Sequence, residues 1–226
     1  MYTVDKNLNK LISGGETFFL DPKEQMLLKR KLKKSEYSTF LPYKDSEKAI
    51  FYVDKIPDVF LYEIKTKQLL RHQDILGALF SLNISKEMFG DIIIRDSKYY
   101  IYILGIVRNY FESNFTKIKN SSVELINRDL DLLKEFEREY EAVEIIVSSE
   151  RIDTVISTII HTNRNSIKEK IKNKEIILNY DFLQSSSYYL HEGDIFSIRK
   201  FGKYNYIGVV KRTKKDNYVV KYLKYI

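Results

Sequence analysis

Residues 148–179, SSERIDTVISTIIHTNRNSIKEKIKNKEIILN, carry the pattern of two short helices followed by a strand. In the second helix, Ile167 and Ile171 share one face, which we expect to pack on a core. The basic residues of that helix recur every four positions on a neighbouring face: Arg164, Lys168 and Lys172. A basic face of this kind suits nucleic acid, although a lysine-rich helix face is more often only solvated.

The segments on either side complete a predicted unit. Val143–Val147 is expected to be a strand that leads into the first helix, which opens with Arg-Ile-Asp at residues 151–153. Asn163 is expected to cap the second helix, because asparagine side chains accept hydrogen bonds from the free N–H groups of a first turn. Ile176–Asn179 is the next predicted strand, and Glu-Gly-Asp at residues 192–194 predicts a tight turn.

The net positive charge lies mostly toward the C-terminal end. Residues 1–143 hold 23 Lys and Arg against 22 Asp and Glu, whereas residues 144–226 hold 15 against nine. Arg199–Ile226 alone contains nine basic residues and one acidic residue. This distribution predicts a polyanionic partner, and nucleic acid is favoured over a membrane because no basic amphipathic helix with an aromatic face is present.

The last segment, YNYIGVVKRTKKDNYVVKYLKYI, predicts a basic hairpin that turns near residues 215–217. Basic residues alternate there with five tyrosines: Tyr204, Tyr206, Tyr218, Tyr222 and Tyr225. Two interpretations remain open for this pattern. Either the rings stack on unpaired bases while the cations hold phosphates, or the lysines protect the edge of a sheet.

Composition predicts a soluble, globular protein of the cytoplasm, and the predicted helices and strands make it an α+β protein. The chain has 226 residues, of which 44% are hydrophobic and 31% charged. It contains no apolar run of about 20 residues, as a membrane span requires, and no apolar signal-peptide core follows its N-terminus. The absence of cysteine excludes disulfides, thiolate metal sites and a cysteine nucleophile.

Residues 1–57 are expected to form a small α/β unit. In FLDPKEQMLLKRKLKK, Asp21 and Glu24 have the spacing of a capping box and Pro22 suits a first turn, which predicts a helix over Pro22–Lys33. Tyr37–Leu41 and Ala49–Val53 are predicted strands, separated by a turn-prone segment.

Residues 58–142 predict an RNA-recognition-like βαββαβ plait. The predicted elements are, in order, strand Val59–Lys65, helix Asp74–Leu82, strand Asp91–Arg95, strand Tyr99–Ile103, helix Gly105–Phe115 and strand Val123–Ile126. The usual glycine-aromatic signature is missing from the third strand, which reads YYIYI. Tyr99 on one side, or Tyr100 and Tyr102 on the other, are candidates for stacking on bases or for core packing. The charged segment after Asn127 is either a helix or an extended arm.

From Ser149 to Asp194 the chain resembles the alpha-L motif, the RNA-binding domain named after bacterial ribosomal protein S-four. The shared features are the Arg151-Ile152-Asp153 opening, Arg164, Ile171-Lys172, a strand closed by Asn179 and the turn at Gly193-Asp194. The resemblance implies that Arg151, Arg164, Lys168 and Lys172 line an RNA surface, with Asp153 orienting the arginines. The family usually has glycine at position 174, where this chain has lysine, so we expect Asn173 to make the left-handed turn.

Three separated runs resemble the YlmH family of bacterial RNA-binding proteins, which places an alpha-L domain after a plait: FLDPKEQ, ILGALFSLNISKEMFGDI and FTKIKNSSV. A family Gly-Arg pair is Lys119-Asn120 here, and a glycine-rich run is replaced around Leu41-Pro42-Tyr43. The implied division is an N-terminal unit at residues 1–57, the plait at 58–142 and an alpha-L domain with a basic extension at 143–226.

The resemblance implies a monomeric RNA-binding protein that contacts rRNA or tRNA on the large ribosomal subunit during quality control of stalled translation. No catalytic group, metal or cofactor is expected. The predicted RNA-binding residues are Arg151, Arg164, Asn165, Lys168, Lys172, Arg199, Lys200 and Lys203. The alternatives are a pseudouridine-synthase-like RNA-modifying enzyme and an adaptor of cell division. No Gly-rich cofactor loop or HExxH motif supports an enzyme, although catalysis by an aspartate would leave no spacing signal.

Overall fold

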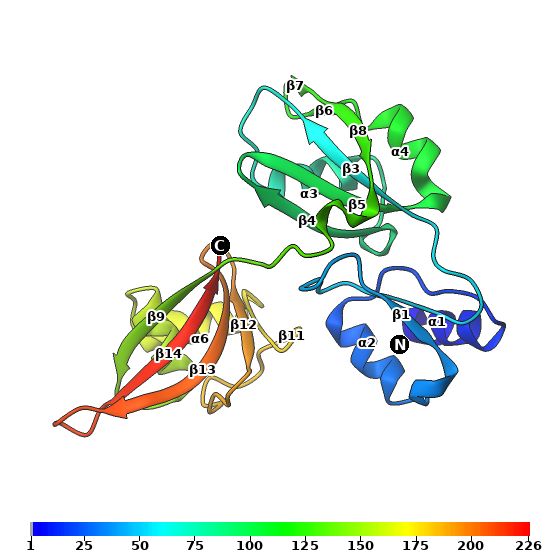
Figure 1. The fold of residues 1–226 in the computed structure, drawn as a ribbon. Helices are drawn as coiled ribbons and strands as arrows, with labels where there is room; N and C mark the ends of the chain where they lie inside the picture. Colours follow the sequence, from blue (N-terminus) through cyan, green and yellow to red (C-terminus); the bar gives the residue numbers. More distant parts are fainter. Residues whose placement is uncertain (1) are drawn as a thin grey trace. The chain divides into compact units, whose positions relative to one another are not determined.

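The computed structural model describes residues 2–226, which fold into two compact units divided between Glu137 and Arg138. Each unit combines helices with its own antiparallel sheet, so the α+β prediction is confirmed (Figure 1). Among the described residues, no helix has the length and apolar character needed to cross a membrane.

Unit 1 begins with two helices and a hairpin. Its first elements are α1 (Tyr2–Ile12), α2 (Pro22–Lys29), the 3-10 turn η1 (Lys34–Glu36), β1 (Ser38–Phe40) and β2 (Ile50–Tyr52). The capping box is confirmed, because the Asp21 carboxylate accepts from the Glu24 N–H at 2.9 Å and the Glu24 carboxylate accepts from the Asp21 N–H at 3.0 Å. The helix ends four residues before the predicted Lys33, in a lysine-rich run where like charges disfavour a further turn. The sequence did not predict α1.

The plait follows in the predicted order. Its elements are β3 (Val59–Lys65), α3 (His72–Ser81), η2 (Lys86–Met88), β4 (Phe89–Arg95), β5 (Lys98–Leu104), η3 (Gly105–Val107), α4 (Arg108–Asn114) and β8 (Glu124–Arg128). The sheet order β4-β5-β3-β8 is antiparallel throughout, which confirms the βαββαβ prediction. A small hairpin of β6 (Lys117–Ile118) and β7 (Ser121–Ser122) lies between α4 and β8.

Both faces of the plait sheet are covered within unit 1. On one face, side chains of α3 and α4 pack with Tyr62 and Ile101. On the other face, Phe19 and Tyr43 pack with Leu61, together with side chains from η4 (Leu130–Leu133). The sheet therefore exposes no broad face of the kind that RNA-recognition domains use for stacking.

The tyrosines of β5 belong to these two cores. The Tyr99 hydroxyl accepts a hydrogen bond from the Leu70 N–H at 2.9 Å in the core beneath the helices. On the opposite face, the Tyr102 hydroxyl donates to the Pro42 carbonyl at 3.1 Å, and its ring stacks on Tyr43. Tyr100 is also buried on that face. The base-stacking interpretation of these three rings is therefore wrong, because packing inside unit 1 occupies them.

Unit 2 is a six-stranded antiparallel sheet with two helices. The elements are β9 (Tyr140–Val147), α5 (Ile152–Ile159), α6 (Arg164–Lys172), β10 (Ile176–Leu178), β11 (Asp181–Phe182), β12 (Ile195–Ile198), β13 (Gly202–Arg212) and β14 (Tyr218–Tyr225). The sheet order is β11-β10-β12-β13-β14-β9. Both helices pack on one face of this sheet, where Val155 and Ile167 share a core with Phe196 and Tyr206. The charged segment before β9 contains only the short η4, so the extended alternative holds for it.

The basic hairpin lies inside this sheet. β14 pairs with β13 and with β9, so it is a central strand. β13 pairs with β12 only at Gly202–Asn205, so its outer part, up to Arg212, pairs with β14 alone and is an edge. Tyr204, Tyr206 and Tyr222 are buried in the core. The base-stacking interpretation is therefore wrong for these three rings. Lys211 and Arg212 lie on the outer edge part of β13, as the edge-protection interpretation expects.

The turn after α6 also differs from the prediction. Asn173 has φ −80°, whereas Lys174 has φ +56° and occupies the left-handed position itself. The Lys174 N–H donates to the Ile171 carbonyl and the Glu175 N–H donates to the Lys170 carbonyl, both at 2.9 Å. This pattern is a Schellman motif, whose hydrogen bonds require the left-handed residue one position after the cap. Lys174 therefore occupies the left-handed position of the turn, at which the resemblance implies glycine.

Candidate nucleic-acid interface

Two of the predicted arginines lie around one buried carboxylate. Asp153, in the first turn of α5, is 1% exposed and accepts two hydrogen bonds from the Arg151 guanidinium, at 3.1 Å from Nε and 2.8 Å from Nη2. Arg164, the first residue of α6, donates to the hydroxyl of Thr154. The start of α5 and the start of α6 therefore bring Arg151 and Arg164 together, although they are thirteen positions apart in sequence.

The electrostatics of this cluster favour ionised groups. Burial opposes ionisation of Asp153, but hydrogen bonds from Arg151 and the positive charges of Arg151 and Arg164 outweigh it and lower the pKa of Asp153. The same hydrogen bonds raise the pKa of Arg151. Two guanidinium groups beside one carboxylate leave an excess of positive charge. Hydrogen bonds fix the positions of these guanidinium groups.

The remaining stripe runs along α6. The Asn163 side chain caps the helix by accepting from the Ser166 N–H at 2.8 Å, as predicted, and Ile167 is completely buried beneath it. Lys168 and Lys172 are exposed, and within residues 2–226 neither makes an ion pair. Asn165 is also exposed on this helix. The stripe is thus a solvent-facing row of cations that continues from Arg164.

A second basic group lies where α6 ends. The Arg199 N–H donates to the Glu175 carbonyl at 2.9 Å, which places the turn between β12 and β13 beside the end of the helix. Glu175 pairs with Lys170 at 2.8 Å, and this hydrogen bond, with the charges of Lys170, Arg199 and Lys200, lowers the pKa of Glu175. Arg199 and Lys200 are exposed, so the structure brings these two predicted residues to the same end of unit 2 as Lys172.

Lys203 does not join this surface. It pairs across the ladder with Ser197, while its neighbour Tyr204 points into the core beneath the helices. Side chains alternate between the faces of a strand, so Lys203 lies on the face opposite α5 and α6. Its ammonium group lies 5.1 Å from the ring centroid of Tyr180 and 4.8 Å from that of Tyr225.

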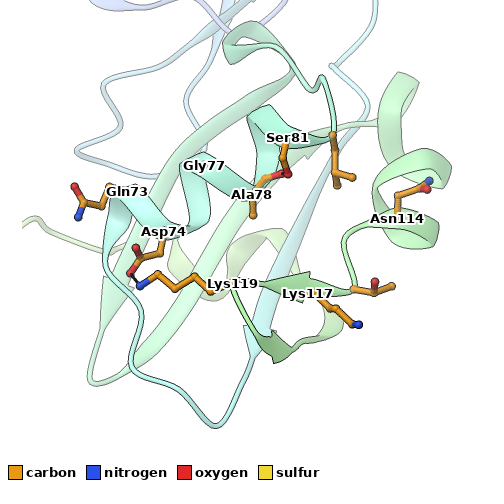
Figure 2. Close-up of a pocket in the computed structure, with 10 residues that line it drawn as sticks. Gln73, Asp74, Gly77, Ala78, Ser81, Asn114, Lys117 and Lys119 are labelled. Atoms are coloured by element: carbon orange, nitrogen blue, oxygen red, sulfur yellow. Dashed lines mark hydrogen bonds and ion pairs between the residues drawn. The ribbon is translucent and has the colours of Figure 1, made fainter.

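A polar hollow in unit 1 was not predicted from the sequence. It has a volume of about 530 Å³ and lies between α3, the end of α4 and the β6–β7 hairpin (Figure 2). Its lining residues are Gln73, Asp74, Gly77, Ala78, Ser81, Leu82, Asn114, Thr116, Lys117 and Lys119. The Lys119 side chain extends toward α3, where its ammonium group pairs with Asp74 at 2.8 Å (Figure 2). The only sequence signal was the Lys119-Asn120 pair, which departs from the family pattern.

Residues 2–226 contain no group of three or more His, Asp or Glu side chains placed to hold a metal ion. The clusters described above present arginine and lysine cations, amides and hydroxyls, beside the carboxylates of Asp153, Glu175 and Asp74 that pair with some of these cations. The cations, amides and hydroxyls can donate hydrogen bonds to phosphate and sugar oxygens.

Comparison with known proteins adds an independent observation. Residues 58–131 match a family model described as "Putative RNA-binding domain in YlmH". The chain is 25% identical over 219 residues to "Ribosome-associated protein quality control protein P2" of Bacillus subtilis strain 168, and the alignment covers 91% of this chain and 85% of that protein. A solved structure, "Cell division protein ylmH from Streptococcus pneumoniae", is 19% identical with a TM-score of 0.49, over 59% of this chain and 93% of that one. The family-model match spans the plait from β3 to β8.

Proposed function

Because this chain belongs to the YlmH family of RNA-binding proteins, we propose that it holds rRNA or tRNA on the large ribosomal subunit during quality control of stalled translation, without catalysing a reaction. The similarity to a protein named for ribosome-associated quality control supports this role. We further infer that unit 2 acts as an alpha-L domain and that the protein acts in the cytoplasm as a monomer.

The arrangement of Arg151 and Arg164 around Asp153 carries the proposal. A guanidinium group held in place loses little side-chain entropy when it binds phosphate, and its N–H groups match two phosphate oxygens at once. Lys168 and Lys172 continue the positive charge along α6, so a phosphate backbone that follows the helix meets successive cations. Arg199 and Lys200 extend the surface beyond the end of the helix.

The proposal is tested by reversing charge on this surface. Exchanging Arg151, Arg164 and Lys168 for glutamate is expected to abolish co-sedimentation with large ribosomal subunits. Because a carboxylate introduced at position 151 would face the buried Asp153, the milder pair Lys168→Glu and Lys172→Glu serves as a second variant, whose side chains are exposed. Each phosphate contact that is removed should lower the slope of log K against log salt by roughly 0.7–0.9.

A matched control reverses three exposed lysines of unit 1, Lys34, Lys55 and Lys98. This variant has the same change in net charge as the triple variant and should still co-sediment. Equal loss of binding in both variants would show that total charge matters and not the α5–α6 surface. Unchanged binding of a folded Lys168→Glu/Lys172→Glu protein would refute the proposed interface. Incubation of purified protein with bound RNA should leave every nucleoside unmodified by mass spectrometry.

A further inference from the structure

We propose that the hollow between α3, α4 and the β6–β7 hairpin binds the sugar–phosphate backbone of a single-stranded RNA segment, as a second site distinct from the α5–α6 surface. The inference rests on the proposed RNA-binding function and names where the plait takes part in it. Four features of unit 1 lead to this site.

The first feature is that the usual RNA surface of a plait is blocked. Residues 58–131 match an RNA-binding family model, yet both faces of their sheet are buried within unit 1. Tyr99, Tyr100 and Tyr102, the rings that could have stacked on bases, are all in the cores. RNA that contacts this domain therefore meets a surface other than the sheet faces, and the helices and the hairpin offer one.

The second feature is the chemistry of the hollow. Its volume of about 530 Å³ lies within the range of small-ligand pockets, roughly 300–1,000 Å³. Lys117 and Lys119 supply ammonium groups, while Asn114, Thr116 and Ser81 supply an amide and hydroxyls. Phosphate oxygens and the ribose 2′-hydroxyl are recognised by these donors and acceptors, and no large aromatic ring lines the hollow for base stacking.

The third feature is the way Lys119 is held. Its backbone has φ +53°, a left-handed conformation that lysine rarely adopts, and its ammonium group pairs with Asp74. Asp74 accepts hydrogen bonds from Lys119 and from Arg71, and these lower its pKa well below the ordinary range. An ammonium group has three N–H donors, so Lys119 retains donors for a phosphate while Asp74 fixes its position. Lys117 is exposed, and within the described residues it makes no ion pair.

The fourth feature is Gly77 in the middle of α3. Glycine lowers helix stability relative to alanine, but its lack of a side chain lets another group approach the backbone closely. A Cβ at Gly77 would meet no atom within 4 Å in this structure, so no packing within the protein requires glycine. Gly77 lines the hollow, where an RNA backbone could lie directly against the helix.

The test fills the hollow without changing charge. Gly77→Gln places a side chain into it, and Asn109→Gln on α4, exposed and outside the lining, is the matched control. The probe is a single-stranded RNA 12-mer of uridine and 4-thiouridine, crosslinked to the full chain and mapped by mass spectrometry. In the wild-type protein we expect crosslinks both in residues 114–122 or 73–82 and in residues 151–172. In Gly77→Gln, the yield of crosslinks in residues 114–122 or 73–82 should fall at least tenfold, while the yield in residues 151–172 stays the same. In Asn109→Gln, both yields should stay the same.

Neutralising Lys117 and Lys119 with glutamine should reduce the salt slope by roughly one for each phosphate that is no longer bound. Gly77→Ala, which adds only a methyl group, should raise the Tm by about 2 °C and so show that the helix tolerates a side chain. Crosslinks confined to residues 151–172, with the affinity of Gly77→Gln unchanged, would overturn this inference and leave the proposed interface of unit 2 intact. Crosslinks confined to unit 1 would support this inference and refute the proposed interface of unit 2.

Discussion

The side-chain amide of Asn179 donates a hydrogen bond to the buried carboxylate of Asp194 at 2.7 Å. The Asn179 side-chain oxygen also accepts from the Ile195 N–H at 3.0 Å, and Asp194 accepts from the His191 N–H at 2.8 Å. The asparagine that closes β10 and the Gly-Asp turn before β12 are therefore one hydrogen-bonded unit. This unit holds the part of the sheet on which α6 packs.

Replacing Asn179 should destabilise unit 2 even when the backbone conformation is made easier. Asn179 has φ +48°, so Asn179→Gly removes backbone strain but takes away the amide donor to Asp194 Oδ1 and the acceptor for the Ile195 N–H. We expect the free energy of unfolding to fall by about 1–3 kcal/mol in urea titrations. Lys200→Gly is the control, because Lys200 is exposed with φ +72° and should be neutral or stabilising. Equal effects of the two changes would contradict the role of the hydrogen bonds.

Lys174→Gly should stabilise the protein. A side chain in the left-handed region costs about 1–2 kcal/mol, while the added freedom of glycine in the unfolded chain offsets part of the gain. The expected net increase in unfolding free energy is about 0.5–1 kcal/mol. Asn173→Gly is the matched control and should not stabilise, since Asn173 has φ −80°. A loss of stability in Lys174→Gly would mean that the contact of its ammonium group with the Phe182 ring, 5.6 Å away, outweighs the strain.

Asp153→Asn should weaken unit 2 at neutral pH and lose this effect in acid. The folded pKa of Asp153 lies below its ordinary value of 3.8, so its stabilisation is present above that value and disappears as pH falls through the folded pKa. We expect a loss of about 1–3 kcal/mol at pH 7, and a difference from wild type that shrinks as pH falls below the ordinary value of 3.8. Asp216→Asn, which alters an exposed pair with Arg212, should change stability by less than about 1 kcal/mol. If the difference in unfolding free energy between the wild type and Asp153→Asn stayed constant with pH, the stabilising role of the ionised Asp153 carboxylate would be refuted.

Because of Lys48, the free energy of unfolding of unit 1 should be higher in mild alkali than at neutral pH. Burial lowers the pKa of Lys48 to about 8, although its ammonium group donates to the Lys86 and Phe89 carbonyls at 2.7 Å. In the unfolded chain, Lys48 has its ordinary pKa of 10.5. Between about pH 8 and pH 10.5 the unfolded state therefore binds more protons than the folded state, so the free energy of unfolding rises with pH. Relative to Lys48→Met, the wild type should gain up to about 3 kcal/mol between about pH 8 and pH 10.5.

The measurement is urea unfolding of both proteins across that pH range. Several tyrosines have a raised pKa in the folded state, as Tyr62 does at about 12, and they change the stability of both proteins alike above about pH 10. Their contribution therefore cancels when the two proteins are compared. Parallel curves for wild type and Lys48→Met would show that Lys48 keeps its proton in the folded state throughout.

The plait and the α5–α6 pair were predictable because their signals are local. The nearly continuous apolar runs of β3 and β5 and the helical spacing of Val155, Ile156 and Ile159 in α5 can be recognised from neighbouring residues alone. The caps at Asp21 and Asn163 need only a side chain and the next turn. The existence of α1 was missed, since long-range packing against Leu20 and Phe51 contributes to it.

Residue types and their order along this chain were enough for its α+β class, the sequence of its elements and the basic row on α6, because each depends on neighbours a few positions apart. Only the tertiary structure showed which side chains remain accessible. Three tyrosines of the C-terminal hairpin and three of β5 are in cores, Lys203 lies on the sheet face opposite Lys168, and Lys119 meets Asp74 across 45 positions. Burial and pairing of this kind arise from contacts between distant segments, and periodicity carries no information about which face another segment will cover.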